Sequence, residues 1–340
     1  MKICVYGVGA IGGLIGYRLA KSGCELSGIA RGATLSALRA EGLRFLGEGG
    51  IESVPMRATS EPAELGVQDL VILSVKAPAL HEVASRIAPL IGPGTIVLTA
   101  MNGVPWWFFR GGEGDQGPAS GPAFGGALAG ASLSSVDPDG AIAAAIPDKS
   151  VIGCVVHLGA SCPEPGLVKS LPLRRLIVGE PSGKPTPRLS SLVRSLSDAG
   201  FEAESTDSIQ REIWYKLWGN MTMNPISALT GATMDRIVDD PLVGRFCIDV
   251  MAEAKRIGGR IGCPIEQTEE DRMKISRELG AFKTSMLQDV EAGRPIELDA
   301  IVSAVHEIGG LVGESTSNID ILLGLSRLKA RTIGLYPGAK

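Results

Sequence analysis

Residues 2–12 read KICVYGVGAIG, and this stretch decides the fold of the N-terminal half. Residues 2–6 are mostly apolar and predict a strand, and residues 11–22 predict a helix directly after it. A Gly-x-Gly-x-x-Gly loop lies between the two. In this setting glycines allow a tight turn and let a pyrophosphate approach the helix N-terminus, whose N–H groups and dipole favour an anion. The pattern predicts a dinucleotide site, although such triplets also occur in ordinary turns. Its residues are Gly7, Val8, Gly9, Ala10, Ile11 and Gly12.

The next predicted strand, residues 25–30, is followed by Arg31. An acidic residue at this place binds the ribose hydroxyls of NAD, whereas a permanently charged guanidinium suits the 2′-phosphate of NADP. The sequence therefore favours NADP (NADPH) as the cofactor. A solvated surface arginine beside a turn is the alternative interpretation.

Two further apolar runs, residues 69–75 and 95–99, predict strands that are buried on both faces. Their alternation with helical stretches indicates a Rossmann-type parallel sheet of the α/β class. Lys76 and Asn102 follow these strands, at the edge of the sheet where ligands bind. Both are candidates for contacts with cofactor and substrate, but a helix cap or a loop charge explains each of them equally well.

The rest of the chain predicts two domains. Residues 42–56 indicate a hairpin or an irregular insert, and residues 111–130, dense in Gly, Pro, Ala and Ser, predict a mobile loop or a lid. Strands at 150–159 and 175–179 extend the sheet. Helical periodicity dominates residues 209–328, which predicts an all-α domain. We therefore expect an NADP-binding Rossmann-like domain over residues 1–204 and a helical substrate and catalytic domain over residues 205–335.

Composition restricts the classes of partner. The 340 residues carry a net charge of −4 with a sequence pI of about 5.6, which argues against nucleic acid. The six cysteines are scattered without a Cys-x-x-Cys pair, and no signal peptide or membrane-length apolar run is visible, which predicts a cytoplasmic protein with reduced thiols. The histidines His81, His157 and His306 lack metal-ligand spacing, so we expect no metal. The sequence does not fix the oligomeric state, and a homodimer stays open.

Residues 211–225 read REIWYKLWGNMTMNP and carry the strongest catalytic signal of the second half. Lys216, Asn220 and Asn224 are spaced four apart and therefore share one face of a helix whose other faces are apolar. Because an ammonium and two amides are costly to bury without partners, this polar ridge predicts a cavity for an anionic or carbonyl-bearing substrate. A solvent-facing stripe is the alternative.

The segment from Ser285 to Asp299 carries further polar residues. Gly293 is placed to end one helix and Pro295 to open the next, which puts Glu297 and Asp299 in a first helical turn. Acids there commonly complement the helix dipole, so position alone favours a structural role for Glu297.

Taken together and in order, these residues resemble the ketopantoate reductase (2-dehydropantoate 2-reductase) family over most of the chain. The residues that carry the resemblance are Gly7 to Gly12, Arg31, Ser74 to Ala77, Met101-Asn102-Gly103, Lys216 with Asn220 and Asn224-Pro225, and Ser285 to Asp289 with Glu297-Leu298-Asp299. The resemblance implies a Rossmann domain, a helical domain, and NADPH-dependent reduction of a 2-oxo acid in the cleft between them, on the route to pantothenate and coenzyme A.

The resemblance also implies roles for single residues. Lys216 corresponds to the general acid that protonates the developing alkoxide, and Glu297 to the carboxylate that binds the substrate hydroxyl and orients the lysine. Arg31 and Lys76 correspond to cofactor contacts. The polar groups around nicotinamide and substrate correspond to Asn102, Asn220, Asn224 and Ser285.

Several positions depart from the family pattern near the expected substrate. Phe282 stands where some members have a polar residue associated with the substrate carboxylate, and Val302-Ser303 stands where members usually show Asn-Gly. Two alternatives therefore stay open. One is an NADP-dependent reductase of another 2-oxo acid or an imine on the same scaffold, and the other is a non-catalytic NADP-binding sensor.

Overall fold

The computed structural model describes residues 1–110 and 128–338, and this chain divides into two compact units. Unit 1 contains Met1–Met101 and Gly140–Ile209, and unit 2 contains Asn102–Phe109, residues 128–139 and Gln210–Lys340. Most of the loop or lid predicted at residues 111–130 lies outside the described residues. Asn102 therefore belongs to the same unit as Lys216, although a predicted Rossmann strand immediately precedes it.

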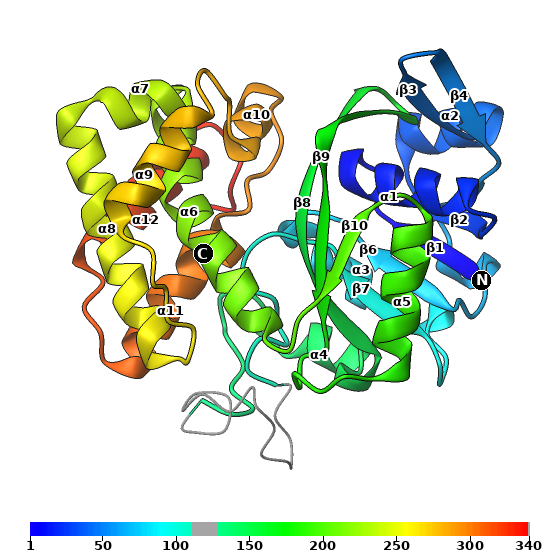
Figure 1. The fold of residues 1–340 in the computed structure, drawn as a ribbon, viewed down its shortest axis with the longest axis horizontal. Coiled ribbons are helices and arrows are strands. Elements are labelled where there is room, and N and C mark those ends of the chain that lie inside the picture. The colour runs from blue at the N-terminus through cyan, green and yellow to red at the C-terminus, as the bar shows by residue number, and fades with distance from the viewer. Residues whose placement is uncertain (111–127, 339–340) are drawn as a thin grey trace. The chain divides into compact units, whose positions relative to one another are not determined.

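Unit 1 is built on a sheet with the strand order β4-β3-β9-β8-β7-β6-β1-β2-β5, in which β10 also pairs with β9 (Figure 1). Strands β7, β6, β1, β2 and β5 are neighbours that run parallel, and every residue of β6 is buried. The predicted Rossmann-type sheet is thus confirmed. The strands are β1 (Lys2–Tyr6), β2 (Glu25–Ile29), β3 (Leu43–Gly47), β4 (Gly50–Val54), β5 (Arg57–Thr59), β6 (Leu70–Leu73), β7 (Ile96–Thr99), β8 (Val151–Glu164), β9 (Leu167–Gly179) and β10 (Glu202–Ser205).

The antiparallel part of the sheet is larger than the sequence predicts. The insert at residues 42–56 is the hairpin of β3 and β4, as expected. Strands β8 and β9 extend well beyond the predicted runs at 150–159 and 175–179, and they pair along most of their length. Much of their added length is exposed and mixes small, polar and apolar residues with prolines, so it lacks the apolar pattern that predicts a strand, and the backbone pairing of the two strands maintains it instead.

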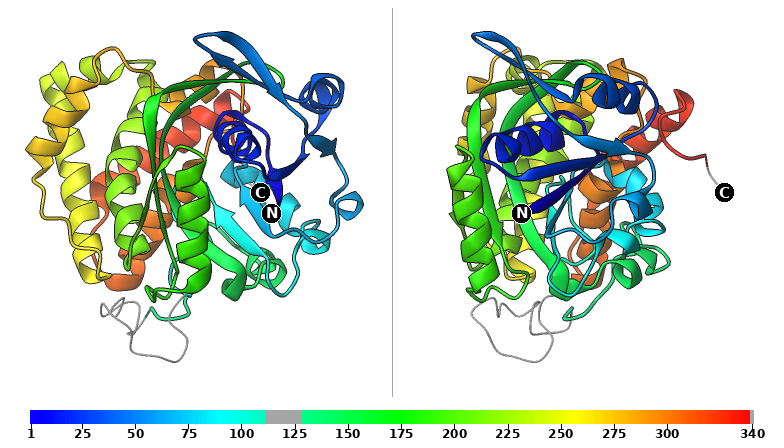
Figure 2. Two further views of the ribbon diagram at one scale, coloured as in Figure 1. Left: turned by 45° about the vertical axis from the view of Figure 1, so that its right-hand side comes forward. Right: turned by 90° about the vertical axis from the view of Figure 1, so that its right-hand side faces the viewer.

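Helix α1 (Ala10–Lys21) packs against several strands of the sheet. It contacts β1 and both strands of the long β8–β9 hairpin, and Figure 2 shows this dark blue helix beside the green hairpin. A Cβ atom at Gly13 would lie 2.6 Å from Cγ2 of Val168, so a glycine is required for the close packing of α1 on β9. The other helices of the unit are α2 (Gly32–Glu41), α3 (Leu80–Ala84), α4 (Ala141–Ala145) and α5 (Pro187–Asp198).

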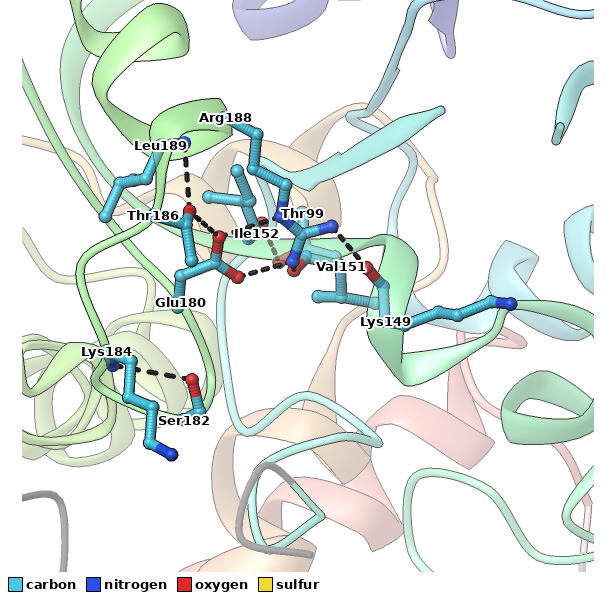
Figure 3. A network of polar contacts seen from close by, with 10 residues as sticks. All are labelled: Thr99, Lys149, Val151, Ile152, Glu180, Ser182, Lys184, Thr186, Arg188 and Leu189. Carbon is cyan, nitrogen blue, oxygen red and sulfur yellow. Dashed lines mark hydrogen bonds and ion pairs between the residues drawn. The ribbon is translucent and has the colours of Figure 1, made fainter. Parts of the chain in front are cut away.

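A buried polar network connects the end of β9 to the start of β8 and to α5 (Figure 3). Glu180 directly follows β9 and is only 3% exposed, and its carboxylate accepts hydrogen bonds from Thr186 Oγ1 at 2.5 Å and Arg188 Nε at 2.8 Å. Arg188 also donates to the backbone carbonyls of Lys149 and Val151. Because the Glu180 carboxylate is paired with the partly exposed Arg188 guanidinium, it can stay buried, and the network connects three elements.

All the regular secondary structure among the described residues of unit 2 is helical, as predicted. Helix α8 packs against α7, α9, α11 and α12 (Figure 1). The indole Nε1 of Trp218 on α6 donates to the carbonyl of Met251 on α8 at 2.8 Å, which joins these two helices. The elements are α6 (Ile209–Thr230), α7 (Met234–Asp239), α8 (Pro241–Arg260), α9 (Glu269–Glu278), α10 (Ser285–Glu291), the π-helix η5 (Asp299–Ser303), α11 (Ala304–Val312) and α12 (Ser317–Thr332).

None of the helices within residues 1–110 and 128–338 is long and apolar enough to cross a membrane.

Candidate active site

The glycine loop of unit 1 is built from backbone rather than side chains. Gly7 follows β1 with a φ of +98°, a conformation that favours glycine, and its carbonyl accepts a hydrogen bond from the Gly9 N–H at 2.8 Å. Helix α1 then begins at Ala10, and no side chain caps its N-terminus. The loop therefore turns the chain sharply from strand to helix, as the sequence predicts.

Gly12 is the sterically most restricted position of this loop. A Cβ atom there would lie 2.0 Å from Oγ of Ser74 and 2.6 Å from the carbonyl oxygen of Gly7. Ser74 fills that space and donates a hydrogen bond from Oγ to the Gly7 carbonyl at 2.9 Å. At Gly9, by contrast, a Cβ would meet nothing within 4 Å. Gly12 is therefore needed for the close packing of α1 against Ser74 and the loop, whereas the space next to the Gly9 Cα atom is open to a ligand.

These features fit the pyrophosphate of a dinucleotide. The first N–H groups of α1 have no partner within the helix, and the helix dipole adds partial positive charge at this end. No acidic residue lies in the first turn of α1 to repel an anion. The residues present would therefore hold a pyrophosphate through backbone N–H groups.

Arg31 lies at the start of α2, directly after β2, and its side chain is half-exposed. Its Nη2 atom forms an ion pair of 2.6 Å with Oε1 of Glu82, and Nη1 of Arg86 lies 3.9 Å from the same oxygen. Because ion pairs at such exposed positions contribute less than about 1 kcal/mol, a phosphate dianion can compete with Glu82 for the guanidinium. Lys76 is exposed at the carboxyl end of β6, as predicted.

In unit 2, one hydrogen bond connects two of the predicted site residues directly. The ammonium Nζ of Lys216 on α6 donates to Oδ1 of Asn102 at 2.8 Å. Both side chains are half-buried. The Lys216 ammonium therefore has a neutral hydrogen-bond acceptor in Asn102, which helps to fix the position of Nζ.

The ridge on α6 is not a solvent-exposed stripe. Asn224 is 6% exposed, and Lys216 and Asn220 are half-buried. The neighbouring Trp214 and Trp218 are almost completely buried. Helix α6 thus presents an ammonium and two amides within an otherwise apolar environment, and such groups call for polar partners or a polar ligand.

Glu297 is buried, with 6% of its surface exposed, but the sequence places it wrongly in a helix. Residues 294–297 have no helical structure, and Asp299 begins the π-helix η5. Pro295 therefore does not open the helix. A π-helical turn is rare and is often associated with functional sites, because it shifts the residues beside it out of the regular helical arrangement.

The loop that carries Asn102 contacts the segment that carries Glu297. The N–H of Val104 donates to the carbonyl of Ala300 in η5 at 2.8 Å. Unit 2 thus brings Lys216, Asn102 and the Glu297 segment into one connected arrangement. Ser285 is exposed at the first residue of α10, and the capping residue Thr284 precedes it.

Comparisons with known proteins agree with this arrangement. The family model described as "Ketopantoate reductase PanE/ApbA" matches residues 3–105, and the model of its C-terminal part matches residues 208–330. A 2-dehydropantoate 2-reductase from Mesorhizobium japonicum is 44% identical over 99% of this chain and 100% of its own length. The chain belongs to the ketopantoate reductase family. It is accordingly an oxidoreductase.

Solved structures extend these similarities. A candidate ketopantoate reductase from Ralstonia solanacearum MolK2 is 56% identical, with a TM-score of 0.91, and the match covers 98% of this chain and 99% of that one. A D-mandelate dehydrogenase solved with NADH and anilino(oxo)acetate has a TM-score of 0.81 at 21% identity, covering 98% of this chain and 100% of that one. At that identity the similarity shows the fold alone.

The structure gives roles to three residues to which the sequence assigned none, although Ser74 and Gly103 belong to motifs that carry the family resemblance. Ser74 supports the glycine loop, and Glu82 pairs with Arg31. Neither has a local signal, because each acts on a residue that is distant along the chain. Gly103 does have a local signal, because it is a glycine shortly after a predicted strand. Its φ of +86° and its close contact with Ala300 require a residue without a side chain.

Proposed function

We propose that this protein reduces 2-dehydropantoate (ketopantoate) to pantoate with NADPH, on the route to pantothenate. The observation that carries the proposal is the hydrogen bond from Lys216 Nζ to Asn102 Oδ1, which holds an ammonium group ready to donate a proton. The 44% identity with the Mesorhizobium japonicum 2-dehydropantoate 2-reductase supports the choice of substrate.

The cofactor in this proposal is NADPH, held by unit 1. When bound, its nicotinamide supplies a hydride to the C2 carbonyl carbon of the substrate. The backbone of Gly7, Gly9 and Ala10 holds the pyrophosphate, and Arg31 together with Lys76 binds the 2′-phosphate. Glu82 has to release Arg31 for that contact, which is a small cost at such an exposed position.

Lys216 acts as the general acid. As the carbonyl carbon accepts the hydride, the carbonyl oxygen becomes an alkoxide, and the Lys216 ammonium transfers a proton to it. Ketopantoate, NADPH and one proton thus give pantoate and NADP⁺. Asn102 accepts a hydrogen bond from the ammonium and keeps Nζ in place before the transfer.

The remaining polar residues of unit 2 bind the substrate in this proposal. Glu297 accepts a hydrogen bond from the substrate hydroxyl and orients Lys216. Asn220, Asn224 and Ser285 donate hydrogen bonds to the carboxylate and the carbonyl. Glu297 and Asn224 are both buried, and they supply a carboxylate acceptor and an amide donor that suit the hydroxyl and the carboxylate of this substrate.

A second candidate is an NADP-dependent reductase of another 2-oxo acid or of an imine. Phe282 favours it, because this residue is 46% exposed just before α10, where some relatives have a polar residue for the substrate carboxylate. An NADP-binding sensor without turnover is the third candidate.

A substrate screen separates these functions. Purified protein with NADPH is given ketopantoate, other branched 2-oxo acids and imines, and the loss of absorbance at the NADPH band is followed. We expect the highest kcat/KM for ketopantoate. A higher value for another compound would reject ketopantoate as the substrate, and NADPH binding without any turnover would support the sensor.

A further inference from the structure

The segment that carries Glu297 depends on tertiary contacts for its conformation. Ile296, Glu297 and Leu298 are all buried, with exposed fractions of 3%, 6% and 0%. Residues 294–297 form no helix or strand, so their backbone polar groups lack the partners that regular structure provides. The position of the Glu297 backbone therefore depends on the contacts that hold this segment from its two sides.

One side is held by the C-terminal end of the chain. After α12, Gly334 adopts a φ of +72° and turns the chain back, and the Leu335 N–H donates to the carbonyl of Ala330 at 2.8 Å. The carbonyl of Leu335 then accepts a hydrogen bond of 3.2 Å from the N–H of Ile296. The last helix thus delivers a backbone partner to the residue that precedes Glu297.

Tyr336 makes a second contact, just beyond Glu297. Its hydroxyl donates to Oδ1 of Asp299 at 2.5 Å, and Oγ of Ser303 donates to the same oxygen at 2.9 Å. The guanidinium carbon of Arg331 lies 5.6 Å from the centre of the Tyr336 ring. Burial and the Asp299 carboxylate raise the pKa of Tyr336, so the phenol keeps its proton and remains a donor at neutral pH.

The other side of the segment is held by the Asn102 loop. The N–H of Val104 donates to the carbonyl of Ala300, and a Cβ at Gly103 would lie 2.6 Å from that same carbonyl oxygen. Asn102 in turn accepts the hydrogen bond from Lys216. A shift of η5 would consequently move the loop that holds the lysine.

We infer that Tyr336 is a positioning residue, which acts through Asp299 to hold the Glu297 segment against the loop that fixes Lys216. This inference rests on the proposed function for the roles of Glu297 and Lys216. Tyr336 itself has no part in the proton or hydride transfer. Its contribution is geometric, because small displacements of catalytic groups slow a reaction strongly.

The first test compares two tyrosines that each donate to a carboxylate. Tyr336→Phe removes the hydroxyl at Asp299, and we expect kcat/KM for ketopantoate to fall about tenfold while the KM for NADPH stays within about twofold. Tyr17→Phe is the matched control, since the Tyr17 hydroxyl donates to Oε2 of Glu52 at 2.9 Å in unit 1. It should leave kcat/KM within about twofold of the wild type. An unchanged kcat/KM in Tyr336→Phe would overturn the inference.

A double-mutant cycle tests whether Tyr336 acts through Glu297. In the Glu297→Gln background, Tyr336→Phe should lower kcat/KM for ketopantoate by less than about twofold, because the carboxylate that Tyr336 positions is already absent. A tenfold loss of kcat/KM in that background would contradict the inference. Asp299→Asn gives a second variant, since its amide oxygen still accepts the hydroxyl, and it should retain more activity than Tyr336→Phe.

A measurement without turnover keeps the inference separate from the proposed function. Amide hydrogen exchange of the peptide covering residues 294–303 should be about tenfold faster in Tyr336→Phe than in Tyr17→Phe. Equal exchange in both variants would overturn the inference even in an active enzyme. If the wild type fails to reduce ketopantoate, the proposed function fails, and faster exchange would still support the contact between Tyr336 and η5.

Discussion

The residues proposed for function form two groups, a backbone half in unit 1 and a side-chain half in unit 2. In unit 1, the proposed dinucleotide loop uses its backbone. Its glycines are needed because a Cβ atom at Gly7 or Gly12 would overlap neighbouring atoms. In unit 2, the proposed acid–base group consists of two side chains, Lys216 and Glu297, and a hydrogen bond and backbone contacts hold the segments that carry them. Added volume should therefore damage the first half, and removed charge should damage the second. Four predictions test this contrast.

The largest effect is expected for Lys216→Ala. Removal of the general acid should lower kcat about a thousandfold, because general acid catalysis contributes roughly that much. Binding of NADPH, followed by fluorescence titration, should be unchanged, since the dinucleotide loop lies in unit 1. The control is Lys274→Ala, which removes an exposed lysine paired with Asp271 and should leave kcat unaltered. A kcat of Lys216→Ala within tenfold of the wild-type value would contradict the role proposed for the Lys216 charge.

Gly12→Ala tests the backbone half. The new Cβ would overlap Ser74 Oγ and the Gly7 carbonyl, so the loop has to shift. We expect the Kd for NADPH to rise about a hundredfold, as small displacements cost that much, and the free energy of unfolding to fall by about 1–3 kcal/mol. Gly310→Ala is the control, because a Cβ there meets nothing within 4 Å in α11. An unchanged Kd in Gly12→Ala would reject the loop as the pyrophosphate site.

Arg31→Ala tests a position where the proposed cofactor site of unit 1 depends on charge. Loss of the contact to the 2′-phosphate should raise the KM for NADPH about tenfold, while the KM for NADH changes little. Steady-state kinetics with both cofactors measure the difference. Equal changes for NADPH and NADH would remove the argument for NADP, and the interpretation of Arg31 as a surface residue paired with Glu82 would then stand.

The smallest effect is expected for Glu307→Gln, which contrasts a structural carboxylate with Glu297. Burial alone would raise the pKa of Glu307, but hydrogen bonds from Ser135 and Ser134 outweigh it and lower the pKa. A folded-state pKa below the unfolded one means that the ionised group stabilises the fold above the ordinary pKa of Glu. This stabilisation is lost as the pH falls through the lowered value.

Thermal unfolding of both proteins measures this pH dependence. The wild type should have the higher Tm at pH 7, and the difference should shrink as the pH falls below the ordinary Glu pKa of about 4.3 and disappear below the lowered pKa of Glu307. The kcat should be the same in both proteins. A difference in Tm that is independent of pH would show that the charge of Glu307 is not responsible.

Sequence alone predicted the backbone half well, because its determinants are local. A strand, three glycines and a helix follow one another within residues 2–21, and each has its own signal. The same holds for Arg31, which directly follows a strand. The ion pair with Glu82 could not be predicted, since it depends on how α3 lies beside the end of β2.

The side-chain half was predictable only in pieces. The polar ridge on α6 followed from a spacing of four, but the contact of Lys216 with Asn102 spans 114 residues and depends on the Asn102 loop joining unit 2. Glu297 was placed wrongly in a helix, because Pro295 resembles a helix start while the buried segment is held by Leu335 and by the Asn102 loop. Its assignment to the site came from the family resemblance alone.

The most direct test of the account follows the hydride itself. Wild-type protein is given ketopantoate and NADPH that is deuterated at both C4 positions, and the product is analysed by mass spectrometry. The account predicts pantoate with one deuterium at C2, formed in equal amount to NADP⁺, and no product in Lys216→Ala over the same time. Pantoate without deuterium, or bound NADPH that is never consumed, would contradict it.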